Sequence, residues 1–150
     1  MLSSSAKGSN SGIKKVKYLL DTNVMIHLFQ AKEPLNSKVQ SHPPADLAIS
    51  GFTEAELRYG IEKSDPKYRA QNELARSLAI APFNMVYHDH SVSEVYGKIK
   101  AHLVVNKIYI PQNEIDIFIA ATAVAKNLIL VTSNTKDFSS IPGLALEDWS

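Results

Sequence analysis

Three acidic side chains occur where apolar stretches of the sequence begin or end. Asp21 follows one short apolar run, Glu56 comes shortly after a second, and Asp116 opens the segment DIFIAATAVA. Carboxylates that meet in a fold repel one another, and a divalent cation offsets that repulsion. All-oxygen acidic sites suit Mg²⁺ or Mn²⁺, and Mg²⁺ binds phosphate oxygens directly. The acids therefore predict a metal-dependent phosphate or phosphodiester site.

Each acid also has a purely structural interpretation. Asp is favoured at helix starts because its side chain accepts hydrogen bonds from backbone N–H groups without a helical partner, and Asp21 fits that role. The segment TEAE has the form of a capping box, in which Thr53 bonds forward and Glu56 reaches back, and NEID ending at Asp116 has nearly the same form. Ser91–Glu94 fits the box equally well. Taken one at a time, the acids are explained as helix caps.

Short apolar runs alternate with longer amphipathic segments from residue 14 onward, which predicts an α/β fold with a parallel sheet. The predicted strands are 16–20, 47–50, 85–87, 128–132 and a weak last strand at 144–146. The predicted helices are 22–31, 54–63, 67–78, 92–105 and 115–126. All strands of a parallel sheet end on one edge, where such folds bind ligands, so Asp21 and Glu56 are expected there. The helix that Asp116 opens is apolar on nearly every side, so it is expected to be packed inside.

Length and composition describe an ordinary globular chain. The 150 residues are expected to form one domain, residues 14–150, after a Ser/Gly-rich disordered leader at residues 1–13. The formal net charge of +1 argues against nucleic-acid binding by bulk electrostatics. The absence of cysteine excludes disulfides and thiolate metal sites. No apolar run reaches the length of about 18 residues that a membrane span requires, so a cytoplasmic protein is expected.

Three segments resemble the PIN-domain ribonucleases, in particular the VapC toxins of bacterial toxin–antitoxin pairs. They are YLLDTNVMIHL, ISGFTEAELRYGIEKS and DIFIAATAVAKNLILVTSNTKDFSSIPGLALEDWS. The resemblance implies a PIN-like α/β/α sandwich with a central, mostly parallel sheet. It also implies a Mg²⁺-dependent endoribonuclease, with Mn²⁺ as an alternative ion, in which Asp21, Glu56 and Asp116 are the catalytic, metal-binding acids.

The fourth catalytic position departs from the family pattern. Many relatives carry Asp at the third position of a T-x-D turn, whereas this chain has Asn134 after Thr132 and Ser133. The resemblance then implies that Asn134 is a neutral ligand that holds a water or a substrate oxygen. Asp137 follows three residues later and is either an outer acid of the site or the cap of a turn. Relatives also often have Asn directly before the third acid, where this chain has Ile115.

The reaction that the resemblance implies is in-line hydrolysis of an RNA phosphodiester. Asp21 and Asp116 would hold one Mg²⁺, and Glu56 would orient a water or accept its proton, with a second ion recruited alongside the RNA. Asn23 and Thr132 are expected to donate hydrogen bonds to carboxylates or phosphate.

Side chains around the acids suggest partners. Arg58 lies within a turn of the second acid and is predicted to contact RNA phosphate, whereas a solvated helix face suits Lys63 better. The resemblance implies structured RNA such as tRNA as the substrate, a cognate antitoxin that covers the acidic pocket, and a homodimer. Leu28, Phe29 and Leu35 are predicted to form an apolar groove for the antitoxin, although core packing explains Leu28 equally well.

Two other functions stay open at this point. One is a noncatalytic PIN-like binding module whose acids form a vestigial cation site, and Asn134 is the feature that favours it. The other is a phosphatase that uses Asp21 as a covalent nucleophile. That enzyme would need a second acid two residues later, where this chain has Asn23.

Overall fold

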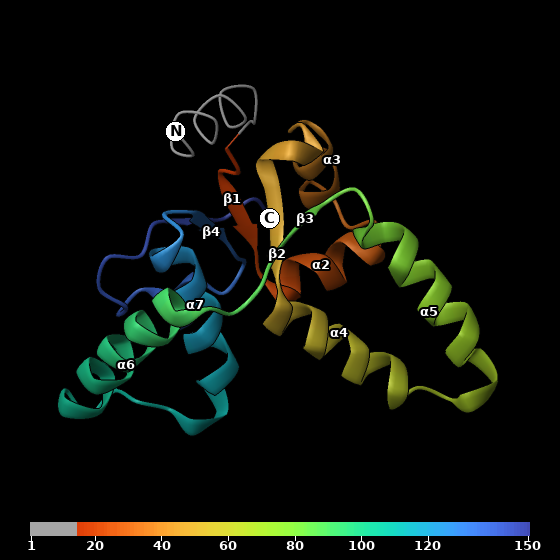
Figure 1. The fold of residues 1–150 in the computed structure, drawn as a ribbon. Helices are drawn as coiled ribbons and strands as arrows, with labels where there is room; N and C mark the ends of the chain where they lie inside the picture. Colours follow the sequence, from red (N-terminus) through yellow and green to blue (C-terminus); the bar gives the residue numbers. More distant parts are fainter. Residues whose placement is uncertain (1–14) are drawn as a thin grey trace, which may run out of the picture.

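The computed structural model describes residues 15–150, so the predicted leader at residues 1–13 lies outside the described part. Five strands form one sheet in the order β3-β2-β1-β4-β5, and every neighbouring pair is parallel (Figure 1). The strands are β1 (Tyr18–Leu20), β2 (Leu47–Ser50), β3 (Asn84–Val86), β4 (Ile129–Val131) and β5 (Leu146–Glu147). The helices are α2 (Thr22–Phe29), α3 (Leu35–Gln40), α4 (Gly51–Glu62), α5 (Pro66–Ile80), α6 (His90–Val105), α7 (Glu114–Ala125) and α8 (Thr135–Phe138). The predicted α/β fold is confirmed, and its sheet is wholly parallel.

The three central strands, β2, β1 and β4, are buried on both faces of the sheet. Successive side chains of a strand point to opposite faces, so each strand contributes to two cores. Leu19 packs in a cluster with residues of α6 and α7, whereas Leu20 packs with residues of α2, α3 and α4. Figure 1 shows α6 and α7 on one side of the sheet and α2 and α5 on the other. This burial explains why the strands read as unbroken apolar runs rather than alternating ones.

The chain changes direction across the sheet at β1. Strands β2 and β3 extend the sheet to one side of β1, and β4 and β5 extend it to the other. Open parallel sheets bind ligands at such a switch point, beyond the carboxyl ends of the strands. Asp21 follows β1 at this point, and its backbone N–H donates to the carbonyl of Val131 in β4 at 2.9 Å. The fold therefore puts the first predicted acid where a ligand site is expected.

Helix α4 begins earlier than the sequence predicts, and the capping box around Glu56 does not form. Ser50, the last residue of β2, caps the helix by accepting a hydrogen bond from the backbone N–H of Thr53 at 3.0 Å. The strand therefore runs straight into the helix at Gly51. Glu56 is left in the second turn, free of any capping role.

The other two predicted boxes are also wrong. Helix α6 is capped by Asp89, which accepts from the backbone N–H of Val92, so Ser91–Glu94 lies inside the helix. Asn113 precedes α7 without a side-chain capping bond. In both α4 and α6 a polar residue nearer the strand reaches the free N–H groups first.

Sequence periodicity misses the shortest elements. Helices α3 and α8 have 6 and 4 residues, which is too few to show a helical repeat. Among the described residues, no helix has both the length and the apolar character needed to cross a membrane.

Candidate active site

Asp21 lies in the turn between β1 and α2 and is 2% exposed. Its two carboxylate oxygens accept hydrogen bonds from the backbone N–H of Thr22 at 2.8 Å and from the Thr132 hydroxyl at 2.9 Å. Burial raises the pKa of Asp21 above its ordinary value, although both hydrogen bonds favour the ionised form. Asp21 thus caps α2 and is also held in one orientation by the end of β4, so the capping and site interpretations are compatible.

Glu56 of α4 is tied to the same turn through Thr22. The Thr22 hydroxyl donates to Glu56 Oε1 at 2.5 Å and lies 3.0 Å from the hydroxyl of the fully buried Thr53. These contacts join the end of β1 to the first turns of α4. The Glu56 charge is also one of the causes that raise the pKa of Asp21, so the two acids lie within electrostatic reach.

Asp116 lies in the first turn of α7 and is half-buried. Burial raises the pKa of Asp116 to about 7, and the nearby charges of Asp21, Glu56 and Asp137 contribute in the same direction. The helix that Asp116 opens is the buried one, as predicted from its apolar sequence, since six residues of α7 are buried. Four carboxyl groups from distant parts of the chain therefore share one electrostatic neighbourhood.

A cleft of about 360 Å³ opens in front of these acids. Its acidic lining consists of Asp21, Glu56 and Asp116, and its other polar lining residues are Thr22, Asn23, Tyr59, Lys63 and Arg76. A smaller cavity of about 100 Å³ lies on the other side of Asp116 and includes Asp137, Lys136 and Asn113 in its wall. Asp116 thus lines both the cleft and the smaller cavity.

The remaining predicted site residues differ in how close they lie to the cleft. Asn23 lines it, whereas Thr132 is fully buried and orients Asp21 from behind. The backbone N–H of Asn134 donates to the Thr132 hydroxyl at 3.0 Å, and its exposed side chain lines neither hollow. The charge of Asp137 raises the pKa of both Asp21 and Asp116. This favours the interpretation of Asp137 as an acid of the site over its interpretation as the cap of a turn.

The structure does not bring Arg58, which was predicted to contact RNA phosphate, to the cleft. Arg58 is exposed, does not line the cleft, and pairs with Glu73 of α5 at 2.8 Å. Arg76 of α5 lines the cleft in its place. The sequence did not indicate Arg76 as a site residue, because only the packing of α5 against α4 brings it to the acids. No local sequence motif predicts that packing.

The acids fit a hard cation by their chemistry but are not closed around one. Carboxylate oxygens are the preferred ligands of Mg²⁺ and Mn²⁺, and the raised pKa of Asp116 reflects negative charge that a cation would neutralise. In the described part of the chain, no three His, Asp or Glu side chains are gathered tightly enough to form a ready ion cage. Glu56 is turned toward the Thr22 hydroxyl instead.

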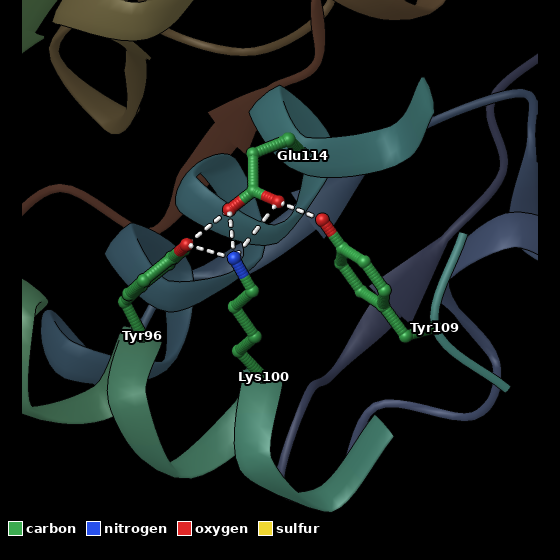
Figure 2. Close-up of polar contacts among 4 residues, drawn as sticks. All are labelled: Tyr96, Lys100, Tyr109 and Glu114. Carbon is green, nitrogen blue, oxygen red and sulfur yellow. Dashed lines mark hydrogen bonds and ion pairs between the residues drawn. The ribbon is translucent and has the colours of Figure 1, made fainter. Parts of the chain in front are cut away.

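A polar network at the start of α7 holds the helix that carries Asp116 (Figure 2). The Glu114 carboxylate accepts hydrogen bonds from the hydroxyls of Tyr96 and Tyr109, and Lys100 Nζ lies 3.3 Å from it. These hydrogen bonds lower the pKa of Glu114. Because Tyr96 and Lys100 belong to α6 and Tyr109 to the following loop, the network joins α6, that loop and α7.

Loss of the Glu114 charge is expected to destabilise the fold. Glu114→Gln removes a charged acceptor from two hydroxyls and one ammonium group, so the free energy of unfolding should fall by about 1 kcal/mol at neutral pH. The pKa of Glu114 is lowered in the folded state, so its contribution should be complete above the ordinary carboxyl range and lost as the pH falls below it. Urea unfolding measures both effects. Glu94→Gln on exposed α6 surface is the control, and an equal midpoint for the two variants would contradict the expectation.

Comparisons with known proteins place the chain in a family. The PIN domain profile matches residues 18–144. Ribonuclease VapC2 of Rickettsia felis is 33% identical over 135 residues, which cover 88% of this chain and 97% of that protein. The tRNA(fMet)-specific endonuclease VapC of Shigella flexneri is 31% identical over 135 residues, covering 90% and 99%.

Solved structures give the same result for the fold. The crystal structure of DNA-bound VapBC from Salmonella typhimurium matches with a TM-score of 0.82 and 29% identity, over 90% of this chain and 99% of that one. VapBC2 from Rickettsia felis, bound to a promoter DNA fragment, matches with a TM-score of 0.80 and 28% identity, over 90% and 100%. The chain belongs to the PIN-domain family and, within it, to the VapC ribonuclease toxins.

Proposed function

We propose that the protein is a Mg²⁺-dependent endoribonuclease that acts as the toxin of a toxin–antitoxin pair. One observation carries this proposal: Asp21, Glu56 and Asp116 line a single cleft at the switch point of the sheet. Mn²⁺ has the same ligand preference and should replace Mg²⁺. The activity is proposed to be cytoplasmic because its substrate is RNA.

Each side chain of the cleft has its own proposed role in hydrolysis. A bound Mg²⁺ would neutralise charge on the phosphate and lower the pKa of water. Asp21, fixed by Thr132, and Asp116 would hold the cation. Glu56 would orient the attacking water and accept its proton, while Asn23 donates to the phosphate. The water oxygen would bond to phosphorus as the bond to the leaving ribose oxygen breaks; that oxygen would keep the bonding electron pair and take up a proton from solvent.

The outer residues have smaller proposed roles. Asp137 would act as an outer acid, since its charge already reaches Asp21 and Asp116. Asn134 would contact a water or a substrate oxygen after a change of side-chain position, because its side chain lines neither hollow. Structured RNA such as tRNA is the proposed substrate class, in keeping with the tRNA(fMet) specificity that some relatives' names carry.

A cognate antitoxin is the proposed partner, since similar solved structures are toxin–antitoxin complexes. Leu28 and Phe29 line a groove of about 390 Å³ between α2 and α5, which suits an apolar antitoxin segment. Leu35 is excluded from this groove because it is buried in the core at 2% exposure. We also propose that the toxin forms a homodimer.

Incubation of the purified protein with end-labelled tRNA tests the proposed reaction. Internal cleavage in the presence of Mg²⁺ is expected, with no release of phosphate from a small phosphate ester. Phosphate release from the ester would instead indicate the phosphatase with Asp21 as nucleophile. RNA binding without metal-dependent cutting would indicate the noncatalytic module with a vestigial cation site.

A further inference from the structure

Arg76 of α5 is a half-buried arginine at the edge of the acidic cleft. Its guanidinium lies over the ring of Phe29, with Cζ 4.9 Å from the ring centre. One of its terminal nitrogens would lie 3.5 Å from a Cβ placed on Gly60, so the backbone of α4 passes close beside it. The guanidinium thus has the Phe29 ring and the backbone of α4 as neighbours before any ligand binds.

The Arg76 guanidinium forms no ion pair with another side chain of residues 15–150. The ion pairs of that part of the chain use Arg58, Lys100, Lys126 and His90, and none uses Arg76. Arg58 lies on the facing helix of the same hairpin and is already paired with Glu73. A half-buried charge with no fixed counterion is available to an anionic ligand.

The cleft itself needs cationic side chains if RNA is to enter it. Its three carboxylates repel phosphate, and a bound cation compensates this only at the scissile group. Arg76 and Lys63 are the cationic residues of the cleft lining; Arg76 lies on α5, and Lys63 is the residue directly after α4. A guanidinium presents a planar fork of donors that matches phosphate oxygens.

We propose that Arg76, assisted by Lys63, binds an RNA phosphate next to the scissile one. The inference rests on the proposed ribonuclease function and adds the residue that positions the strand. Stacking on Phe29 holds the guanidinium in place, so little side-chain entropy is lost when phosphate binds. Lys63 Nζ lies 5.1 Å from the ring centre of Tyr59, a residue that is 66% exposed and can contact an adjacent base.

Steady-state cleavage of one RNA hairpin by the full chain tests Arg76. For Arg76→Gln we expect KM to rise by about ten- to one-hundred-fold, with little change in kcat, because one charge-assisted contact to the ground-state strand is lost. The slope of log affinity against log salt should fall by about 0.7, which is the loss of one phosphate contact on a single strand. Arg76→Lys should retain the salt slope but not the full affinity.

Arg58→Gln is the matched control on the same hairpin, and its KM should change by no more than about twofold because its charge is already paired. A salt slope equal to that of the wild type for Arg76→Gln would overturn the inference even if KM rises, since a merely structural loss does not change the number of phosphate contacts. A wild-type protein that fails to cut RNA would instead overturn the proposed function.

Discussion

Replacement of Asp116 by asparagine is expected to reduce RNA cleavage by about 10³-fold, equivalent to about 4 kcal/mol in the barrier, while making the metal-free protein more stable. The amide keeps the shape of the side chain but cannot supply a negative oxygen to a cation. Stability should rise because burial and the charges of Asp21, Glu56 and Asp137 all disfavour the ionised form of Asp116. Single-turnover cleavage and thermal unfolding in a chelating buffer at about pH 8 measure the two effects.

Opposite changes in activity and stability distinguish a functional acid from a structural one. When a residue that only supports the fold is replaced, the protein loses activity and stability together. Glu62→Gln is the control, because Glu62 is an exposed acid at the end of α4 and does not line the cleft. If Asp116→Asn were less stable than the wild type in the absence of metal, Asp116 would be an acid that supports the fold rather than a functional one.

Removal of divalent ions should abolish cleavage and make stability fall as the pH rises. The folded-state pKa of Asp116 is about 7, above its ordinary value of 3.8, so the folded protein holds this proton more tightly than the unfolded chain. The contribution of Asp116 to the free energy of unfolding is therefore most favourable below about pH 4 and is lost as the pH rises through about 7. Added Mg²⁺ should raise Tm at about pH 8 and have little effect near pH 5, where Asp116 is protonated.

Thermal unfolding with a chelator and with Mg²⁺ across this pH range measures the coupling. Mn²⁺ should restore cleavage to the chelated protein, since it prefers the same oxygen ligands. Equal stabilisation by Mg²⁺ at both ends of the pH range would show that the ion binds somewhere other than at Asp116. Full cleavage in a chelator would remove the metal from the mechanism altogether.

Local sequence pattern was enough to place the first acid and the sheet. The run before Asp21 reads as a buried strand, and the bounds of β2 are those predicted. Parallel strands share one ligand-binding edge, so the position of Asp21 followed from the order of elements alone. The apolar sequence after Asp116 likewise predicted a buried helix, and α7 is buried.

Long-range packing determined the helix caps and the positions of the two arginines, which the sequence pattern did not predict. The capping boxes failed because Ser50 and Asp89 sit nearer the strand ends and reach the free N–H groups first. Arg58 was predicted from its closeness to Glu56 in sequence, but its partner Glu73 comes from α5. The same packing of α5 brings Arg76 to the cleft, which no local motif indicates.

Calorimetric titration of the wild type and of Asp21→Asn with Mn²⁺ at about pH 8 tests most directly whether the distant carboxylates act as one cation site. The wild type should bind Mn²⁺ saturably at this pH, which lies above the Asp116 pKa of about 7, so the carboxylate is ionised. Asp21→Asn should lose that binding, while Glu62→Gln keeps it. Saturable binding of equal strength in the wild type and Asp21→Asn would contradict a shared site at the switch point of the sheet.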